Sequence, residues 1–219
     1  MLRVELISYT PEPEKICALA MRLCHFKGSL EELRDALNPL EIDRLLKKAK
    51  KLQHLSVFEH AYFTFYIEGI SRVTTHQLVR HRIASYSQQS QRFVRVKEET
   101  IIPISIERND EIKKLYESAI ENAFQCYEKL IEMGVPKEDA RYLLPQAVET
   151  KIIVSMNARE LMHFFSLRTC NNSQWEIREM AWKMLEKVRE VAPIIFSDAG
   201  PYCFRGPCPE GKNCVPERR

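Results

Sequence analysis

Glycine is scarce in this sequence of 219 residues, and the glycine-rich loops that commonly hold nucleotides are missing. Only 6 glycines occur, and neither a GxGxxG nor a GxxxxGK[ST] pattern is present. Those loops bring backbone amides close to phosphate groups. If the protein binds a nucleotide, side chains must therefore hold it.

The sequence also lacks long apolar runs and an arrangement for export. No apolar run approaches the roughly 20 residues that span a bilayer, and the first ten residues, MLRVELISYT, do not have the layout of a signal peptide. The seven cysteines are odd in number, which argues against a complete disulfide framework. We expect a soluble, reduced, cytoplasmic protein.

Charge of one sign is not in large excess either. The formal net charge of +3 is too small to indicate a general nucleic-acid-binding protein, and the lysine run at residues 47–51 is interpreted as a solvated helix face. Hydrophobic residues make up 45% of the chain, enough for a sizeable core. No repeat or linker divides the sequence, so we predict a single mixed α/β domain over residues 1–199 and a Cys/Pro/Gly-rich tail over residues 200–219.

Residue periodicity and capping residues predict the secondary structure. Ser71 and Asn157 are expected to cap the helices that follow them, and Gly134 to end a long helix. Glu160, three residues after Asn157, completes the pattern of a capping box. The predicted strands are Leu2–Ser8, Glu59–Ile67, Val94–Pro103 and Lys151–Met156. The predicted helices are Pro11–Cys24, Leu30–Leu37, Pro39–Leu52, Ser71–Ile83, Asp110–Met133, Asn157–Arg168, Gln174–Val191 and one that begins near Pro136 and carries Arg141.

The segment Arg80–Phe93, RHRIASYSQQSQRF, concentrates polar groups that can bind a ligand. It holds three arginines, one histidine, three serines and three glutamines, so we expect neither a core strand nor an ordinary amphipathic helix there. If the preceding helix extends to residue 83, Gln77, Arg80 and His81 share one face and Arg82 points elsewhere. Guanidinium groups bind phosphates and carboxylates through paired hydrogen bonds, so the arginines of this segment could hold more than one anionic group.

Three interpretations of this segment fit its composition about equally well: a solvated loop, an RNA-binding loop and a site for a small nucleotide. The hydroxyls and amides of residues 87–90 match the donors and acceptors on the edge of a pyrimidine or of an isoalloxazine ring. Only Tyr86 and Phe93 are available for base stacking, which weakens the RNA-binding interpretation.

Arg80, His81 and Arg82, followed after seven residues by Ser90, resemble the RHR-x7-S signature of flavin-dependent thymidylate synthases. The resemblance extends over most of residues 1–191. It includes FEHAYFTFYI (58–67), ARYLLP (140–145), NARELMHFFSLR (157–168) and QWEIR (174–178), together with His54 and Ser56.

The resemblance implies an enzyme that methylates dUMP to dTMP. Methylenetetrahydrofolate would supply the carbon, and FAD reduced by NADPH would supply the hydride. The resemblance further implies an antiparallel sheet flanked by helices, and a homotetramer whose active sites are shared between subunits, with no nucleic-acid or membrane partner.

The family's binding residues carry over by position, and Arg168 matches the arginine that acts on the N3/O4 edge of the uracil. His54 matches a residue near the flavin that helps to admit folate. The chain departs from the family at Gln88, where many members have glutamate, and at Ser87, where asparagine is common. The residues implied for dUMP are Gln77, Arg80, Gln88, Gln89, Ser90, Gln91, Arg92, Arg141 and Arg168. The residues implied for FAD are Ser56, Arg80, His81, Arg82, Gln88, Asn157, Arg159 and His163.

Two routes could make C5 of the uracil nucleophilic. A serine that adds to C6 needs a nearby base, and the sequence places none beside Ser90. Arg168 could instead stabilise the negative charge that develops on the ring, and we prefer this route. Without the resemblance, His163 would be interpreted as a histidine on a helix flank and His54 as one at a helix end.

Four cysteines leave a further question open. Cys170, Cys203, Cys208 and Cys214 could together bind zinc, form a disulfide or remain free thiols. The C-x4-C-x5-C spacing of the last three is looser than that of paired CxxC motifs. The zinc signal is therefore weak, and no residue is assigned to a metal; zinc, a disulfide and free thiols stay open as alternatives.

Overall fold

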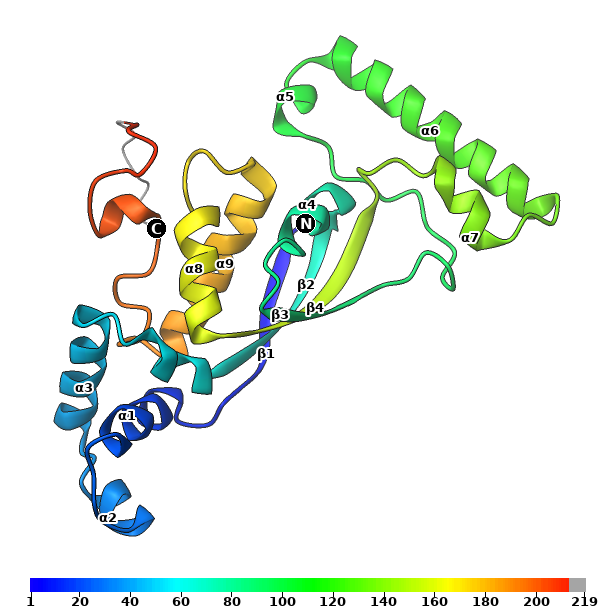
Figure 1. Cartoon of the computed structure of the whole chain (residues 1–219). Coiled ribbons are helices and arrows are strands. Elements are labelled where there is room, and N and C mark those ends of the chain that lie inside the picture. Colours follow the sequence, from blue (N-terminus) through cyan, green and yellow to red (C-terminus); the bar gives the residue numbers. More distant parts are fainter. Residues whose placement is uncertain (213–219) are drawn as a thin grey trace. The chain divides into compact units, whose positions relative to one another are not determined.

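The computed structural model, which describes residues 1–212, combines a four-stranded sheet with helices (Figure 1). The strands are hydrogen-bonded in the order β1-β2-β4-β3. β2 and β4 run in opposite directions, because Ala61 pairs with Ala158 while Thr64 pairs with Ser155. The predicted mixed α/β fold with an antiparallel sheet is thus confirmed. The strands are β1 (Arg3–Tyr9), β2 (Tyr62–Ser71), β3 (Ala84–Gln88) and β4 (Glu149–Asn157).

Contacts within the chain group it into two compact units, and each is described by itself. The strands continue from one unit into the other. The expected domain boundary after residue 199 stays a prediction. The first unit comprises Met1–Arg3, Ile67–Val79 and Ser87–Ile152, and the second comprises Val4–Tyr66, Arg80–Tyr86 and residues 153–212.

The first unit buries its apolar residues between the long helix α6 and the segments beside it. Ile120, Phe124 and Tyr127 lie on one face of α6 and form a buried cluster with Ala140 and Val148. Their spacing of three and four residues is that of an amphipathic helix. The helices of this unit are α4 (Arg72–Leu78), α5 (Ile104–Glu107), α6 (Asp110–Glu132), α7 (Lys137–Ala140) and the 3-10 turn η2 (Arg141–Leu143).

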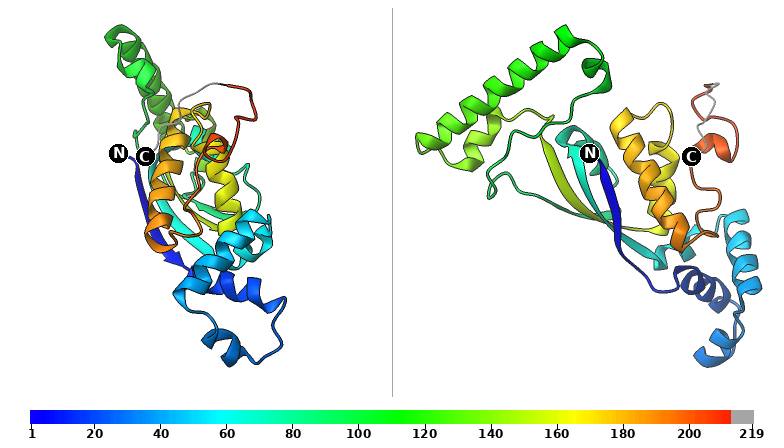
Figure 2. Two further views of the ribbon diagram at one scale, coloured as in Figure 1. Left: turned by 90° about the vertical axis from the view of Figure 1, so that its left-hand side faces the viewer. Right: turned by 180° about the vertical axis from the view of Figure 1, so that it is seen from behind.

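The second unit has a core rich in phenylalanine. The rings of Phe63 and Phe165 lie 5.4 and 5.9 Å from the ring of Phe196. Helices α8 and α9 pack side by side (Figures 1 and 2), and α1 packs against α3 and η1. The helices of this unit are α1 (Pro13–Leu23), α2 (Leu30–Asp35), α3 (Pro39–Lys51), η1 (Leu55–His60), α8 (Ala158–Arg168), α9 (Trp175–Val191) and η3 (Tyr202–Phe204).

Most predicted helices are confirmed, including the helix caps. The Ser71 hydroxyl accepts a hydrogen bond from Thr74 N–H, and the Asn157 amide oxygen accepts one from Glu160 N–H. Gly134 follows α6 with a positive φ of 90°, as expected for a residue that ends a helix.

One helix is shorter than predicted, and its early end separates residues that were expected to share a helix face. α4 stops at Leu78, so residues 80–83 are not helical. The expectation that Gln77, Arg80 and His81 share a helix face is therefore wrong: Arg80 is exposed and His81 is buried. The Tyr86 hydroxyl donates to the His81 carbonyl at 2.7 Å, which supplies a side-chain partner to a carbonyl outside the helix.

Two strand predictions are also corrected. Residues 84–88, for which no strand was predicted, form β3, although the polar composition had argued only against a core strand. β3 lies at an edge of the sheet and alternates half-buried and exposed residues, so its outward positions tolerate polar side chains. The predicted strand Val94–Pro103 is not formed, and it contributes an isolated bridge between Thr100 and Val148. Its charged residues leave no continuous apolar face to bury.

The cysteine question is answered only in part. Cys170 and Cys208 are free thiols, whereas Cys214 lies outside the described residues. Among residues 1–212, no three His, Cys, Asp or Glu side chains are grouped so that they could hold a metal ion.

Candidate functional site

A buried histidine in the second unit connects two charged side chains of α8. His81 follows α4 in the sequence, and its side chain is 4% exposed. Its Nδ1 lies 3.3 Å from Oε1 of Glu160, and Arg168 Nε donates a hydrogen bond to its Nε2 at 3.1 Å. Because a guanidinium nitrogen can only donate, Nε2 must accept, and the imidazole proton must lie on Nδ1, facing Glu160.

The surroundings of His81 keep its ring neutral. Burial, together with the charges of Arg168 and His163, lowers the pKa of His81 from 6.5 to about 4. Burial also raises the pKa of the Glu160 carboxyl and lowers that of the Arg168 guanidinium. A neutral imidazole, with one donor and one acceptor, fits between these two groups.

A cavity of about 660 Å³ opens beside α8 in the same unit. Asn157, Arg159 and His163, all implied for FAD by the resemblance, line it together with Glu59 and Ile83. The volume falls in the range of ligand sites, roughly 300–1,000 Å³. Arg159 and His163 are four positions apart on α8 and both border this cavity, as residues on one helix face do.

Two of these lining residues also have structural roles. The side-chain amide oxygen of Asn157 caps α8, which leaves the side-chain NH₂ group as the part that can bind a ligand. Arg159 Nη1 pairs with Glu59 Oε1 at 2.5 Å, and both side chains are about half exposed. This pair holds the guanidinium at the rim of the cavity.

The cavity wall includes residues that sequence reasoning missed. Lys50, from the run interpreted as solvated, has a side chain only 14% exposed, and its Nζ donates to Ile194 O at 2.8 Å and pairs with Asp198. Arg205 Nη2 donates to Ser166 Oγ at 2.5 Å. Lys50, Asp198 and Arg205 all line the cavity. Nothing in the spacing of these residues could have indicated this, because the contacts join distant parts of the chain.

In the first unit, the last residue of β3 and the residues that follow it make a second polar group. The Gln88 amide nitrogen donates to the hydroxyls of Thr75 and Thr150, each at 3.2 Å. These bonds use both N–H groups and leave the carbonyl oxygen of Gln88 as an acceptor. Arg72 Nη2 donates to the Gln89 carbonyl at 3.0 Å. A smaller hollow of about 200 Å³ lies beside this segment.

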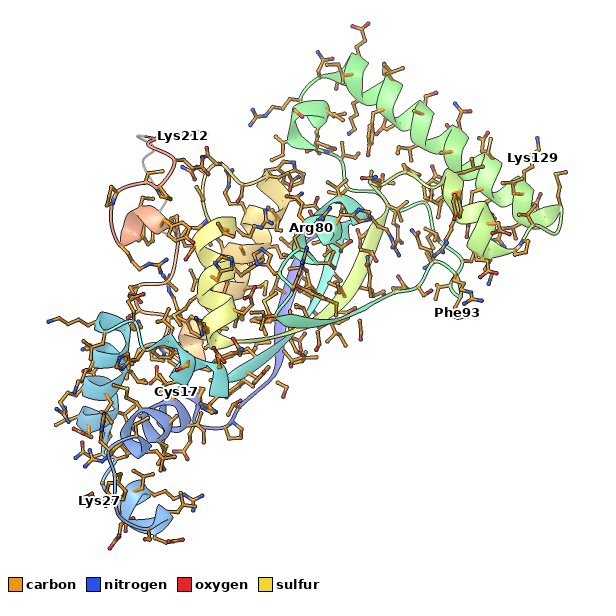
Figure 3. All side chains as sticks on the ribbon, in the orientation of Figure 1. Cys17, Lys27, Arg80, Phe93, Lys129 and Lys212 are labelled. Carbon is orange, nitrogen blue, oxygen red and sulfur yellow. The ribbon has the colours of Figure 1, made fainter. Side chains whose placement is uncertain are left out.

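Ser90 and Arg92 lie at the edge of the same group. Ser90 Oγ accepts from the Arg92 backbone N–H at 3.2 Å, a local turn contact. Within residues 1–212, no imidazole or carboxylate is hydrogen-bonded to this hydroxyl, so nothing there activates it as a nucleophile. The Arg92 guanidinium pairs with Glu138. Phe93, the next residue, marks this loop in Figure 3.

Arginine charge accumulates near this group. Burial lowers the pKa of Arg72, and the charge of Arg141 lowers it further. Arg141 Nε donates to the Glu138 carbonyl at 3.0 Å. Two guanidinium groups that repel each other favour the binding of an anion between them. Arg72 was not predicted as a site residue, although it stands in the helix just before the predicted Gln77.

The predicted residues thus fall into two sets. Arg80, labelled in Figure 3, and Arg82 are exposed on either side of His81 in the chain. The set in the second unit is His54, Ser56, Arg80, His81, Arg82, Asn157, Arg159, His163 and Arg168, and the set in the first unit is Gln77, Gln88, Gln89, Ser90, Gln91, Arg92 and Arg141.

Comparison with known proteins places this chain in one family. Residues 5–194 match the model of the family described as thymidylate synthase complementing protein. The chain is 52% identical over 213 residues to a flavin-dependent thymidylate synthase of Geobacter sulfurreducens, covering 96% of this chain and 92% of the relative. It is 48% identical over 220 residues to a protein of that name from Pyrococcus horikoshii, covering 96% of this chain and 90% of the relative.

A solved structure shares the fold. The UMP/dUMP methylase PolB from Streptomyces cacaoi, bound with 5-Br dUMP, superposes with a TM-score of 0.79 at 23% identity, over 90% of this chain and 93% of that chain. The fold and the family match define a protein of the thymidylate synthase complementing class. The chain belongs to the flavin-dependent thymidylate synthase family. No helix within the described residues is long and apolar enough to cross a membrane.

Proposed function

We propose that this protein is a methyltransferase that converts dUMP to dTMP. Methylenetetrahydrofolate supplies the carbon, and FAD reduced by NADPH supplies the hydride. The observation that carries the proposal is the 52% identity to a flavin-dependent thymidylate synthase over 96% of this chain. The two polar groups described above support it, because each offers donors and positive charge without a glycine-rich loop.

The cavity beside α8 suits a flavin cofactor. Its volume of about 660 Å³ and its arginine, amide and imidazole groups match a ligand with a polar ring edge and a diphosphate. Bound FAD would carry the hydride that reduces the transferred carbon. The residues that would hold it are Ser56, Arg80, His81, Arg82, Gln88, Asn157, Arg159 and His163.

The geometry refines the role of two of these residues. Both ring nitrogens of His81 already have partners, Glu160 and Arg168. His81 would therefore support the cofactor site from behind rather than donate to the flavin. Asn157 would bind through its amide NH₂ group, since its oxygen caps α8.

The group in the first unit suits the nucleotide. The Gln88 carbonyl oxygen can accept a hydrogen bond from N3–H of the uracil, because the amide nitrogen is occupied by Thr75 and Thr150. An amide in place of the family's common glutamate can therefore still bind the base. Arg92 and Arg141 would bind the phosphate, and Arg92 would leave its ion pair with Glu138 to do so. Gln77, Arg80, Gln89, Ser90 and Gln91 complete the proposed dUMP set.

Arg168 is the proposed catalytic residue. It would stabilise negative charge on the N3/O4 edge of the uracil, which makes C5 a better nucleophile. The hydrogen bond from its Nε to His81 fixes the plane of the guanidinium, so the terminal nitrogens are presented in one orientation. Ser90 would bind the nucleotide and would not attack it.

Tritium release from C5-labelled dUMP tests this proposal. Release should require FAD, methylenetetrahydrofolate and NADPH together. Ser90→Ala should keep measurable turnover, whereas Arg168→Ala should lose about 100- to 1,000-fold, the usual effect of removing a group that stabilises charge in the transition state. NADPH oxidation without tritium release would indicate a flavin oxidase instead. A colourless protein that binds RNA and takes up no FAD would contradict the proposal entirely.

We also propose that the protein is a homotetramer whose active sites are shared between subunits, and that it is located in the cytoplasm. His54 is assigned to folate access. If active sites are shared, mixing inactive Arg141→Ala and Arg168→Ala subunits should restore part of the activity, because some mixed sites contain both arginines. No recovery after dissociation and reassembly would refute sharing between these two positions.

A further inference from the structure

We propose that Glu160 is a positioning residue, which acts through His81 to hold the guanidinium of Arg168 in its working orientation. The inference rests on the proposed role of Arg168. Glu160 is not among the site residues implied by the family resemblance. The sequence predicted it only as part of a capping box with Asn157.

The first step is the placement of Glu160. It lies in the first turn of α8, and its backbone N–H is bound by the Asn157 side chain at 2.8 Å. In a capping box the carboxylate would turn back toward the backbone N–H of Asn157. Here its Oε1 lies 3.3 Å from His81 Nδ1 instead, and the residue is 7% exposed. A buried carboxyl has been directed to an imidazole from another part of the chain.

The second step is the distance along the helix. Arg168 lies eight positions after Glu160 on α8, which is about 12 Å along the helix axis. Direct pairs on a helix form between residues three or four apart, so the carboxyl and the guanidinium are not such neighbours. The His81 ring bridges them, with one nitrogen toward each.

The third step is the position of the imidazole proton. Arg168 Nε always carries a proton, so His81 Nε2 must accept and Nδ1 must donate. The Glu160 carboxyl provides the acceptor that selects this tautomer. In the other neutral tautomer, two N–H groups would face each other between Arg168 and His81, and the guanidinium would lose its partner.

The surroundings of the ring restrict other arrangements. The Phe164 ring packs edge-on at 4.9 Å from the His81 ring, and the His163 ring lies at 5.9 Å. The Tyr86 hydroxyl fixes the His81 carbonyl at 2.7 Å. Because the ring cannot easily turn away, the proton on Nδ1 decides whether Arg168 is held.

Enzyme kinetics with matched variants tests the proposal. Glu160→Ala removes the acceptor, and kcat for tritium release should fall about 10- to 100-fold, the usual effect of losing a group that orients a functional side chain. The KM for dUMP should stay within about threefold, and kcat is measured at saturating FAD because Glu160 also lines the cavity assigned to the cofactor. Glu160→Gln keeps an oxygen that can accept from Nδ1–H and should recover most of kcat.

Glu41→Gln serves as the control. Its carboxylate is also largely buried, with 16% of the side chain exposed, and pairs with Arg22 on the same unit, remote in sequence from α8. This variant should keep wild-type kcat. If Glu160→Ala keeps wild-type kcat, or if KM and the FAD Kd carry the whole effect, the positioning role is refuted.

A second measurement does not depend on activity. The ¹⁵N chemical shifts of the His81 ring, assigned with His81→Asn, report its tautomer in the protein without substrate. The wild type should show the Nδ1–H form, and Glu160→Ala should lose it. An Nε2–H ring in the wild type would overturn the inference, even if Glu160→Ala failed to fold. Absence of tritium release in the wild type would instead refute the proposed function and leave the tautomer result standing.

Discussion

Acidification should destabilise this protein through His81 before most carboxylates are protonated. The ring is neutral when folded, because burial and the charges of Arg168 and His163 lower its pKa to about 4, from 6.5 for an exposed histidine. Its folded pKa is therefore below its unfolded pKa. Stability from this group is fully present above pH 6.5 and is lost as the pH falls from 6.5 toward 4, because the unfolded chain binds the proton first.

The size of the effect follows from these two values. Each pH unit between them changes the free energy of unfolding by about 1.4 kcal/mol. Between pH 6.5 and pH 5, His81 should thus remove about 2 kcal/mol, and the complete loss near pH 4 should be about 3 kcal/mol. Burial raises the pKa of Glu160, so that carboxyl acts in the opposite sense and gains stability as the pH falls.

Urea unfolding at several pH values measures this loss. Trp175 and Trp182 on α9 provide the fluorescence signal, and the protein concentration is kept constant because association shifts apparent stability. His81→Asn is the reference, because asparagine does not titrate in this range. The variant keeps Glu160, so the contribution of that carboxyl is present in both proteins. The difference in unfolding free energy between the two proteins should shrink by about 2 kcal/mol from pH 7 to pH 5. Parallel curves for the two proteins would refute the account of His81 as a buried neutral ring.

Three further substitutions probe other parts of the structure. Asn157→Ala should lower the free energy of unfolding by about 1 kcal/mol, because the side-chain amide oxygen caps α8. Thermal unfolding measures this loss, and Asn157→Asp, which keeps the cap, is the control. Gly69→Ala should destabilise by about 1–3 kcal/mol, because Gly69 has a φ of +73° and a Cβ would lie 2.4 Å from the Met1 carbonyl; an unchanged urea midpoint would contradict this. Gln88→Glu should retain dUMP within about tenfold by calorimetry, because the Thr150 hydroxyl can donate to a carboxylate as well as accept from an amide, whereas the Thr75 hydroxyl donates its proton to the Arg72 carbonyl.

Local features of the sequence predicted local structure well. Ser71 and Asn157 were expected as caps from their residue type, and both side chains make the expected hydrogen bonds. β3 was missed because an edge strand can carry alternating polar residues that resemble a loop. The helix before β3 was predicted to be too long, because no local feature of the sequence shows that other parts of the chain bury His81.

The candidate site was predictable as a set of residues but not as an arrangement. The partners of His81 lie 79 and 87 positions away in the sequence, and only the fold brings them together. The role of Glu160 could not be inferred for the same reason, since its local context predicted a capping box. Lys50 was misjudged because its run of lysines is typical of solvent-exposed helices, while its partners Ile194 and Asp198 lie in a distant segment.

The edge strand gives a physical meaning to the seven residues that separate Arg82 from Ser90. Along β3 each successive side chain turns to the opposite face, with Ser87 outward and Gln88 half-buried toward Thr75 and Thr150. Inserting or deleting one residue before Gln88 would exchange these two faces for every position that follows. The number of residues in this interval therefore sets which side chains face outward. The outward residues can vary in identity, but the interval cannot change by an odd number of residues.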